Sequence, residues 1–146
     1  MFSILRPTRL YDINKIVDKT DLDGNVIKNF ASDTKYLNFK SNINASNNIV
    51  IRDKNGVSLG DNNKVKTGDN VILTVNSKEY AYILSVLGDV DGNGSVNVSD
   101  IVSVAMTIVN NRELDKEVFY ASDYDGNDSI NVADIVGIAN KIVGNN

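Results

Sequence analysis

Oxygen-bearing side chains alternate along two stretches of the chain, residues 89–100 (the first loop) and residues 123–134 (the second loop). Oxygen ligands at positions 1, 3, 5, 7, 9 and 12 of such a loop wrap a calcium ion, with position 7 binding through its backbone carbonyl. Magnesium demands a tighter octahedron and retains its waters, so loops this rich in ligands favour calcium. We therefore predict two Ca²⁺ ions as cofactors. The predicted ligands are Asp89, Asp91, Asn93, Ser95, Asn97 and Asp100 in the first loop, and Asp123, Asp125, Asn127, Ser129, Asn131 and Asp134 in the second.

The two loops belong to an internal repeat. Residues 89–112 align with residues 123–146 at an offset of 34, and 14 of the 24 positions are identical. The alternative, acidic surface turns without metal, does not account for two such loops in register, each followed by apolar residues at helical spacing. Two departures from a calmodulin-type loop stand out, because position 12 is Asp in both loops and position 6 of the second loop is Asp128 instead of Gly. Asp tolerates a left-handed backbone, so we expect a weaker second loop that still binds.

Composition and charge narrow the function classes. The chain has 146 residues, a net charge of −4, no cysteine and no histidine. These absences exclude a disulfide scaffold, a zinc finger, a thiol nucleophile and imidazole chemistry. Residues 1–87 carry 12 basic against 9 acidic residues, whereas residues 88–146 carry 3 against 10. So acidic a segment is not expected to bind nucleic acid and needs cations in order to fold. We also expect no membrane span.

The elements around the loops separate one class of calcium protein from another. Residues 80–88 alternate apolar and polar positions with aromatic and β-branched residues, which predicts a strand leading into the first loop. Helical spacing follows from Ser99 to about Asn110 and recurs after the second loop, and residues 113–121 suit a short linking helix. A calcium sensor would need a helix entering each loop, so the predicted strand argues against that alternative.

This order of loop, helix, linking helix, loop and helix resembles a dockerin module of the type I-like class, found in bacterial extracellular assemblies. The resemblance rests on Gly88-Asp-Val-Asp-Gly-Asn-Gly-Ser-Val-Asn-Val-Ser-Asp-Ile101 and on Phe119-Tyr-Ala-Ser-Asp-Tyr-Asp-Gly-Asn127. It implies calcium-dependent binding to a cohesin module of a scaffold or cell-surface protein, no catalysis by the module itself, and a secreted or cell-surface location. We expect the chain to be a monomer when no partner is bound. Whether the parent protein is an enzyme or a scaffold stays open.

The resemblance also implies which residues contact the cohesin, namely loop positions 10 and 11 and one side of each following helix. The basic pair that is common in cellulosomal members is replaced by Ala105-Met106 and Ala139-Asn140, so we expect a more apolar contact. Each helix has a second apolar stripe beyond the one that a small core needs, which favours an interface, although packing against the other helix or the N-terminal part is the alternative. The predicted contacts are Val98, Ser99, Val102, Ala105, Met106 and Val109, with Val132, Ala133, Val136, Ala139, Asn140 and Val143 as their counterparts.

Residues 1–87 suggest a β-rich module. We expect strands at residues 13–17 and 25–29, a short helix near Tyr36, a hairpin of residues 49–52 with 57–59, and another of residues 71–75 with 80–86. With Val65-Lys-Thr-Gly-Asp-Asn-Val71, this organisation resembles the X modules that precede dockerins. An alternative function is carbohydrate recognition by a calcium-binding accessory protein through Tyr11, Phe30, Tyr36, Tyr80 and Tyr82, but core packing is the favoured role of these rings.

The predicted fold class is therefore an α+β chain of two modules. A small, mostly antiparallel β module occupies residues 1–87, and an all-α module with two calcium loop–helix motifs occupies residues 88–146.

Overall fold

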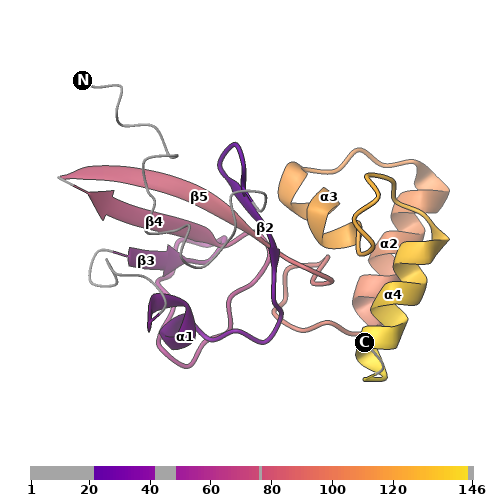
Figure 1. Ribbon diagram of the computed structural model, residues 1–146, viewed down its shortest axis with the longest axis horizontal. Coiled ribbons are helices and arrows are strands. Elements are labelled where there is room, and N and C mark those ends of the chain that lie inside the picture. The colour runs from indigo at the N-terminus through magenta and orange to yellow at the C-terminus, as the bar shows by residue number, and fades with distance from the viewer. Residues whose placement is uncertain (1–21, 42–48, 76, 145–146) are drawn as a thin grey trace.

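A twisted sheet forms one end of the molecule and three helices form the other (Figure 1). The structure is a computed structural model that describes residues 22–41, 49–75 and 77–144. Its strands are β1 (Leu22–Asp23), β2 (Val26–Phe30), β3 (Ile49–Arg52), β4 (Asn70–Val75) and β5 (Lys78–Val86). Its helices are α1 (Tyr36–Ser41), α2 (Val98–Asn110), α3 (Lys116–Ser122) and α4 (Val132–Ile142).

The strands form one mixed sheet in the order β1-β2-β5-β4-β3. β4 and β5 make the predicted antiparallel hairpin, with Val71 opposite Tyr82 and Leu73 opposite Tyr80. β2 runs parallel to β5 and places Val26 beside Ile83. β5, the longest strand, therefore lies at the centre of the sheet and is hydrogen-bonded on both sides.

The core of the sheet is built from the side chains that alternate onto its inner face, as the period of two requires. Ile51, Leu73 and Leu84 are fully buried, and α1 covers them with Phe39. Each such side chain contributes about 1.5–3 kcal/mol by leaving water. The aromatic residues proposed as a sugar platform belong to this core where the structure describes them: Phe30, Tyr36, Tyr80 and Tyr82 are all buried. Tyr11 lies outside the described residues.

The helical end has its own small core. α2 and α4 pack against each other. Val104 of α2 and Ile138 of α4 are fully buried and form one cluster with Val90, which is also buried. Ile101 and Ile135, which occupy the same place in the repeat, pack against this cluster. The predicted helices after both loops are thus present. One apolar stripe of each helix provides the core through Ile101, Val104, Ile135 and Ile138, whereas Ile108 and Ile142 at its far end are exposed.

Helix α3 joins the two ends of the molecule. It packs on β2 and β5 (Figure 1), where the Ser85 hydroxyl donates to the Glu117 carbonyl at 2.7 Å. The Gly88 N–H donates to the Ala121 carbonyl at 3.0 Å, and the Tyr120 hydroxyl donates to the carboxylate of Asp23. These contacts fix the helical end directly on the sheet.

The predicted fold class is therefore wrong. The chain is α+β, but its sheet is mixed because β2 pairs parallel to β5. The helices are also not confined to a separate all-α C-terminal module, since α1 lies within the sheet part and α3 packs on two strands of the sheet. The boundary between residues 87 and 88 stays a prediction, and no spacer separates β5 from the first loop.

Residues 57–59 turn back beside β3, with backbone hydrogen bonds from Asp53 to Val57 and from Leu59 to Ile51 and an antiparallel bridge between Arg52 and Ser58, but they form no continuous strand. The other edge of β3 pairs along its length with β4. The predicted strand at residues 13–17 lies outside the described residues. Among the described helices, none has the length and apolar character needed to cross a membrane.

Candidate metal centres

The two loops have the same backbone path because the aspartate at position 1 of each loop accepts hydrogen bonds from backbone N–H groups at positions 5 and 6. Asp89 Oδ1 accepts from the Asn93 N–H at 3.1 Å, and its Oδ2 accepts from the Gly94 N–H at 3.1 Å. In the second loop, Asp123 accepts from the N–H groups of residues 127 and 128 at 3.2 and 2.9 Å. Residue 6 of each loop has positive φ, 88° at Gly94 and 66° at Asp128. The expectation that Asp128 can occupy this turn is thus confirmed.

The last positions of each loop also start the following helix. Asn97 is the N-cap of α2, where its side chain accepts from the Ser99 N–H, and the Asp100 carboxylate accepts from the Asn97 N–H at 2.8 Å. Asn131 and Asp134 form the same capping box at α4. Such a reciprocal cap satisfies donors that a helix otherwise leaves unpaired. Loop positions 9 and 12 therefore fix the helix direction as well as the loop, which the ligand spacing alone did not indicate.

Three carboxylates converge in each loop. In the first cluster (Asp89, Asp91 and Asp100) and in the second cluster (Asp123, Asp125 and Asp134), one ligand oxygen from each residue lies within 4.8 Å of the others. Asp89, Asp100 and Asp134 are fully buried and Asp123 nearly so. Unit charges this close repel by about 3–4 kcal/mol per pair at an effective dielectric constant of 20.

The electrostatics of both clusters disfavour ionised carboxylates. Burial raises the pKa of Asp100 to about 6, and the adjacent Asp91 charge adds to this effect despite the backbone N–H groups that lower it. Burial likewise raises the pKa values of Asp89, Asp123 and Asp134. Among the described residues, no lysine or arginine forms an ion pair with any of the six clustered aspartates. The clusters can therefore bind a metal ion, which would supply the missing positive charge.

The donor set fits a hard cation. Carboxylate and amide oxygens are available at loop positions 1, 3, 5, 9 and 12, and neither nitrogen from imidazole nor sulfur from cysteine exists in the sequence. The backbone N–H of Asn93 donates to the carboxylates of Asp89 and Asp91, so the loop itself already orients these two ligands. This orientation reduces the ordering that binding would require.

Comparison of the chain with protein-family models, with curated proteins and with solved structures gave no match. The chemistry assigned to these loops therefore rests on their own geometry and charge. The ligand roles predicted from the sequence stay predictions, but the structure brings the carboxylates of loop positions 1, 3 and 12 together in both loops.

Among the described residues, the first loop is supported by the segment between β3 and β4, and the second loop has no such support. The backbone N–H of Thr67 donates to Asp89 Oδ2 at 3.1 Å, and the Thr67 hydroxyl bonds both backbone groups of Val86. A Cβ at Gly92 would lie 2.7 Å from the Thr67 carbonyl and 2.6 Å from Lys54 Nζ, whereas one at Gly126 would meet nothing within 4 Å. Sequence reasoning missed Thr67 and Lys54, because a backbone donor from a distant turn leaves no local signal.

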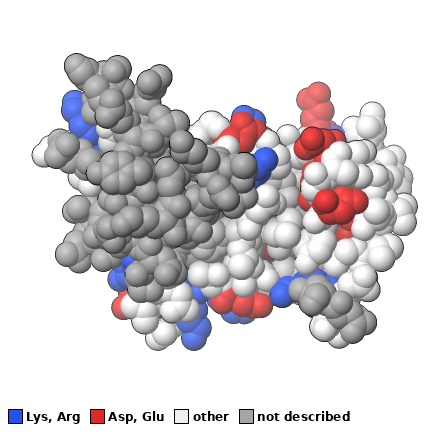
Figure 2. Space-filling model, in the orientation of Figure 1, with Lys and Arg blue, Asp and Glu red and all other residues white. Residues whose placement is uncertain are grey.

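The predicted contact residues form an exposed apolar surface on the two helices. We define the docking face as the exposed valines and methionine of this set. On the first copy of the repeat the exposed fractions are 63% at Val98, 53% at Val102, 42% at Met106 and 79% at Val109. On the second copy they are 64% at Val132, 53% at Val136 and 67% at Val143. Ser99, Ala133 and Asn140 are also exposed, whereas Ala105 and Ala139 are half-buried. In Figure 2 the edge of the molecule over α2 and α4 is largely uncharged.

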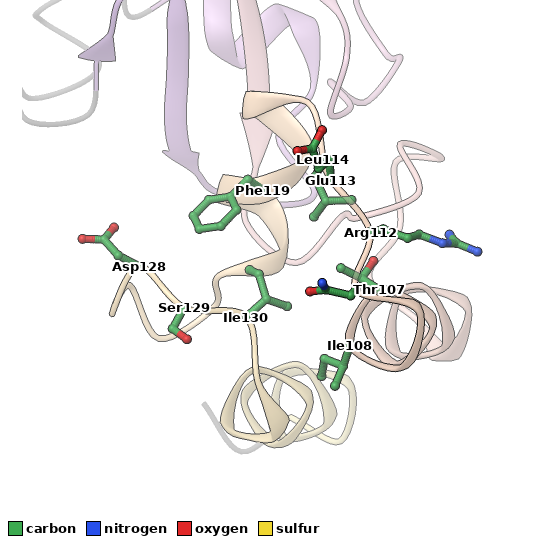
Figure 3. A pocket seen from close by; sticks show the side chains of 10 residues that line it. Thr107, Ile108, Arg112, Glu113, Leu114, Phe119, Asp128, Ser129 and Ile130 are labelled. Atoms are coloured by element: carbon green, nitrogen blue, oxygen red, sulfur yellow. The ribbon is translucent and has the colours of Figure 1, made fainter.

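A separate cleft of about 590 Å³ opens between the end of α2, α3 and the second loop (Figure 3). Leu114, Phe119 and Ile130 line it, while the charged ends of Arg112 and Asp128 point outward. None of the six clustered aspartates lines this cleft. Ser129, the predicted ligand at position 7, does line the cleft together with Asp128, so the cleft borders the second loop without reaching its carboxylate cluster.

Proposed function

We propose that the chain is a calcium-dependent docking module of the dockerin type, holding two Ca²⁺ ions and binding a cohesin module. The ions would be held by the oxygen ligands of the first and second loops. Calcium suits them better than magnesium because each loop offers many oxygen ligands, whereas magnesium keeps several of its waters.

The observation that carries the proposal is the position of the docking face relative to the loops. Exposed valines stand at the same repeat positions on both helices, at Val98 and Val132, Val102 and Val136, and Val109 and Val143. Each helix begins inside its loop through a capping box. Metal that holds a loop therefore also holds the helix that follows it, and the partner would recognise this arrangement.

An apolar surface on two metal-ordered helices supports a protein partner over a small molecule. Contiguous exposed apolar side chains on a monomer mark interaction sites, and exposed valines offer neither hydrogen bonds to a sugar nor charge to a nucleic acid. The choice of cohesin as the partner, the secreted location, the monomeric state and the absence of catalysis come from the dockerin resemblance. No described aromatic surface favours the carbohydrate-binding alternative, so we do not propose it.

Calorimetric titration of the full chain against a panel of cohesins, in calcium and in chelator, tests the proposal. Val102→Asp with Val136→Asp should abolish binding, because it places two charges in an apolar contact, while leaving the melting temperature within a few degrees. Val57→Asp is the matched control, since Val57 is exposed to 61% but lies on the sheet part. Absence of binding to every cohesin in calcium would refute the docking function, and binding that persists in chelator would refute its metal dependence.

A further inference from the structure

The two loops differ in chemical reactivity at positions 5 and 6. The first loop carries Asn93-Gly94, whereas the second carries Asn127-Asp128. An asparagine followed by glycine is the step at which the next backbone nitrogen most easily reaches the side-chain carbonyl carbon, because glycine has no Cβ to hinder the approach. One other such step occurs in the sequence, Asn55-Gly56, on an exposed turn of the sheet part.

The folded first loop engages both reacting groups in hydrogen bonds. The Gly94 N–H donates to Asp89 Oδ2 at 3.1 Å, and the side-chain oxygen of Asn93, Oδ1, accepts from the Ser95 N–H at 2.9 Å. Gly94 is buried, whereas the Asn93 side chain is exposed to water. Attack by the Gly94 nitrogen therefore requires the loop to open and the bond to Asp89 to break.

The fold also explains why glycine stands at this position. Gly94 has a φ of 88°, and a Cβ there would lie 3.2 Å from the Lys66 side chain, because the first loop packs against the sheet part. The second loop accommodates Asp128 at the equivalent turn. The packing of the first loop thus places the reactive step inside a metal-binding cage.

We propose that Asn93 is a deamidation site whose reaction is controlled by metal bound to the first loop. This inference rests on the proposed calcium binding. The Gly94 nitrogen loses its proton and attacks the Asn93 side-chain carbon, the bond from that carbon to the amide nitrogen breaks, and ammonia leaves. The resulting succinimide is opened by one water molecule at either carbonyl, giving aspartate or an isoaspartyl linkage at residue 93. Nothing is oxidised or reduced.

Metal controls the reaction because it would hold Asn93 directly and Gly94 through the hydrogen bond to Asp89. Asp89 and Asn93 are ligands at positions 1 and 5 of the loop, so the bound state keeps the Gly94 nitrogen and the Asn93 carbonyl in their closed geometry. Without metal, repulsion among the three clustered carboxylates favours the open loop. The isoaspartyl product lengthens the backbone by one carbon inside the cage and moves the Ser95 carbonyl, so the molecules that carry it would lose the first site, whereas those with aspartate at residue 93 would keep an oxygen ligand there.

The test is to incubate the full chain in chelator and in graded calcium, and to follow residues 93, 55 and 127 by peptide mass spectrometry. Calcium binding to each sample is first measured by calorimetry. When opening is rapid, the rate at Asn93 should fall in proportion to one plus the ratio of calcium to its dissociation constant, about 100-fold at 100 times that constant. The rate at Asn55 should not change. Asp128→Gly transfers the reactive step into the second loop and should create a second calcium-controlled site at Asn127.

The outcomes separate this inference from the proposed function. If calcium binds and the rate at Asn93 is the same with and without it, the inference is overturned while the proposed function stands. If Asn93 is inert in chelator under conditions where Asn55 reacts, the inference is overturned as well. If calcium does not bind at all, both fail, and the calorimetry shows this before any deamidation is measured.

Discussion

Asp100→Asn should change stability in opposite directions with and without calcium. Asp100 is fully buried, and its oxygens lie within 4.8 Å of ligand oxygens of Asp89 and Asp91. Two like-charge pairs at this distance cost about 3–4 kcal/mol each at an effective dielectric constant of 20. Hydrogen bonds from the N–H groups of Asn97 and Asp91, at 2.8 and 3.1 Å, offset part of that cost.

The pKa of Asp100 shows what remains after this offset. Its rise from 3.8 to about 6 corresponds to about 3 kcal/mol against the ionised form. Asparagine removes the charge but keeps a carbonyl oxygen for only one of the two N–H donors. We therefore expect the metal-free variant to be more stable than the parent chain at neutral pH by about 1–3 kcal/mol, or about 3–12 °C in melting temperature.

In saturating calcium the sign should reverse, because the variant lacks a carboxylate ligand. Loss of residues that only support a metal ligand already reduces affinity by about 10–100-fold, so loss of the ligand itself should exceed tenfold. Thermal unfolding followed by circular dichroism, in chelator and in calcium, measures both effects. Asp115→Asn is the control, since Asp115 is exposed and outside both clusters. A variant that melts lower than the parent chain in both conditions would refute the electrostatic reasoning and leave Asp100 as a helix cap only.

Three further outcomes follow from the structure. Thr67→Val removes the hydroxyl that bonds both backbone groups of Val86 and should lower the free energy of unfolding by about 1–3 kcal/mol. Calcium titration should show weaker binding at the first loop alone. An equal loss of affinity at both loops would contradict the role of the Thr67 contact in supporting the first loop. In chelator, the clustered carboxyls with raised pKa bind protons more tightly in the folded chain than in the unfolded one. The stability of the metal-free protein should therefore fall as pH rises from about 5 to about 7. A melting temperature that rises over this pH range would disprove the reasoning. Gly137→Ala should lower stability by about 1–3 kcal/mol despite a helix-propensity gain of about 1 kcal/mol, because the new Cβ would lie 2.5 Å from the Tyr124 ring; an increase in unfolding free energy would show that the ring moves aside freely.

The candidate site was predictable from the sequence because its determinants are local. Ligands two residues apart in a twelve-residue loop are brought together by the loop itself, and the following helices by their own periodicity. The hairpin of β4 and β5 was predictable for the same reason, since a short turn joins Val75 to Lys78. The internal repeat strengthens the prediction of the metal loops, because each copy supports the interpretation of the other.

The parts that sequence reasoning missed depend on distant contacts. Alternating apolar residues indicate a strand but not the direction of its neighbour, so the parallel pairing of β2 with β5 left no signal. Packing of α3 on the sheet involves Ser85, Glu117 and Tyr120, and no sequence pattern indicates that these residues contact another element. The docking of Thr67 on Asp89 joins residues 22 positions apart through a backbone N–H, which every non-proline residue possesses.

The direct passage from β5 through Gly88 into the first loop has a mechanical consequence. Tension applied at the two C-terminal helices would reach the rest of the chain along the axis of the strand that lies innermost in the sheet. Hydrogen bonds to β2 on one side and to β4 on the other would then be loaded in shear, so many of them would have to rupture together instead of peeling open one by one. Such a joint would resist steady pulling far better than its modest size suggests.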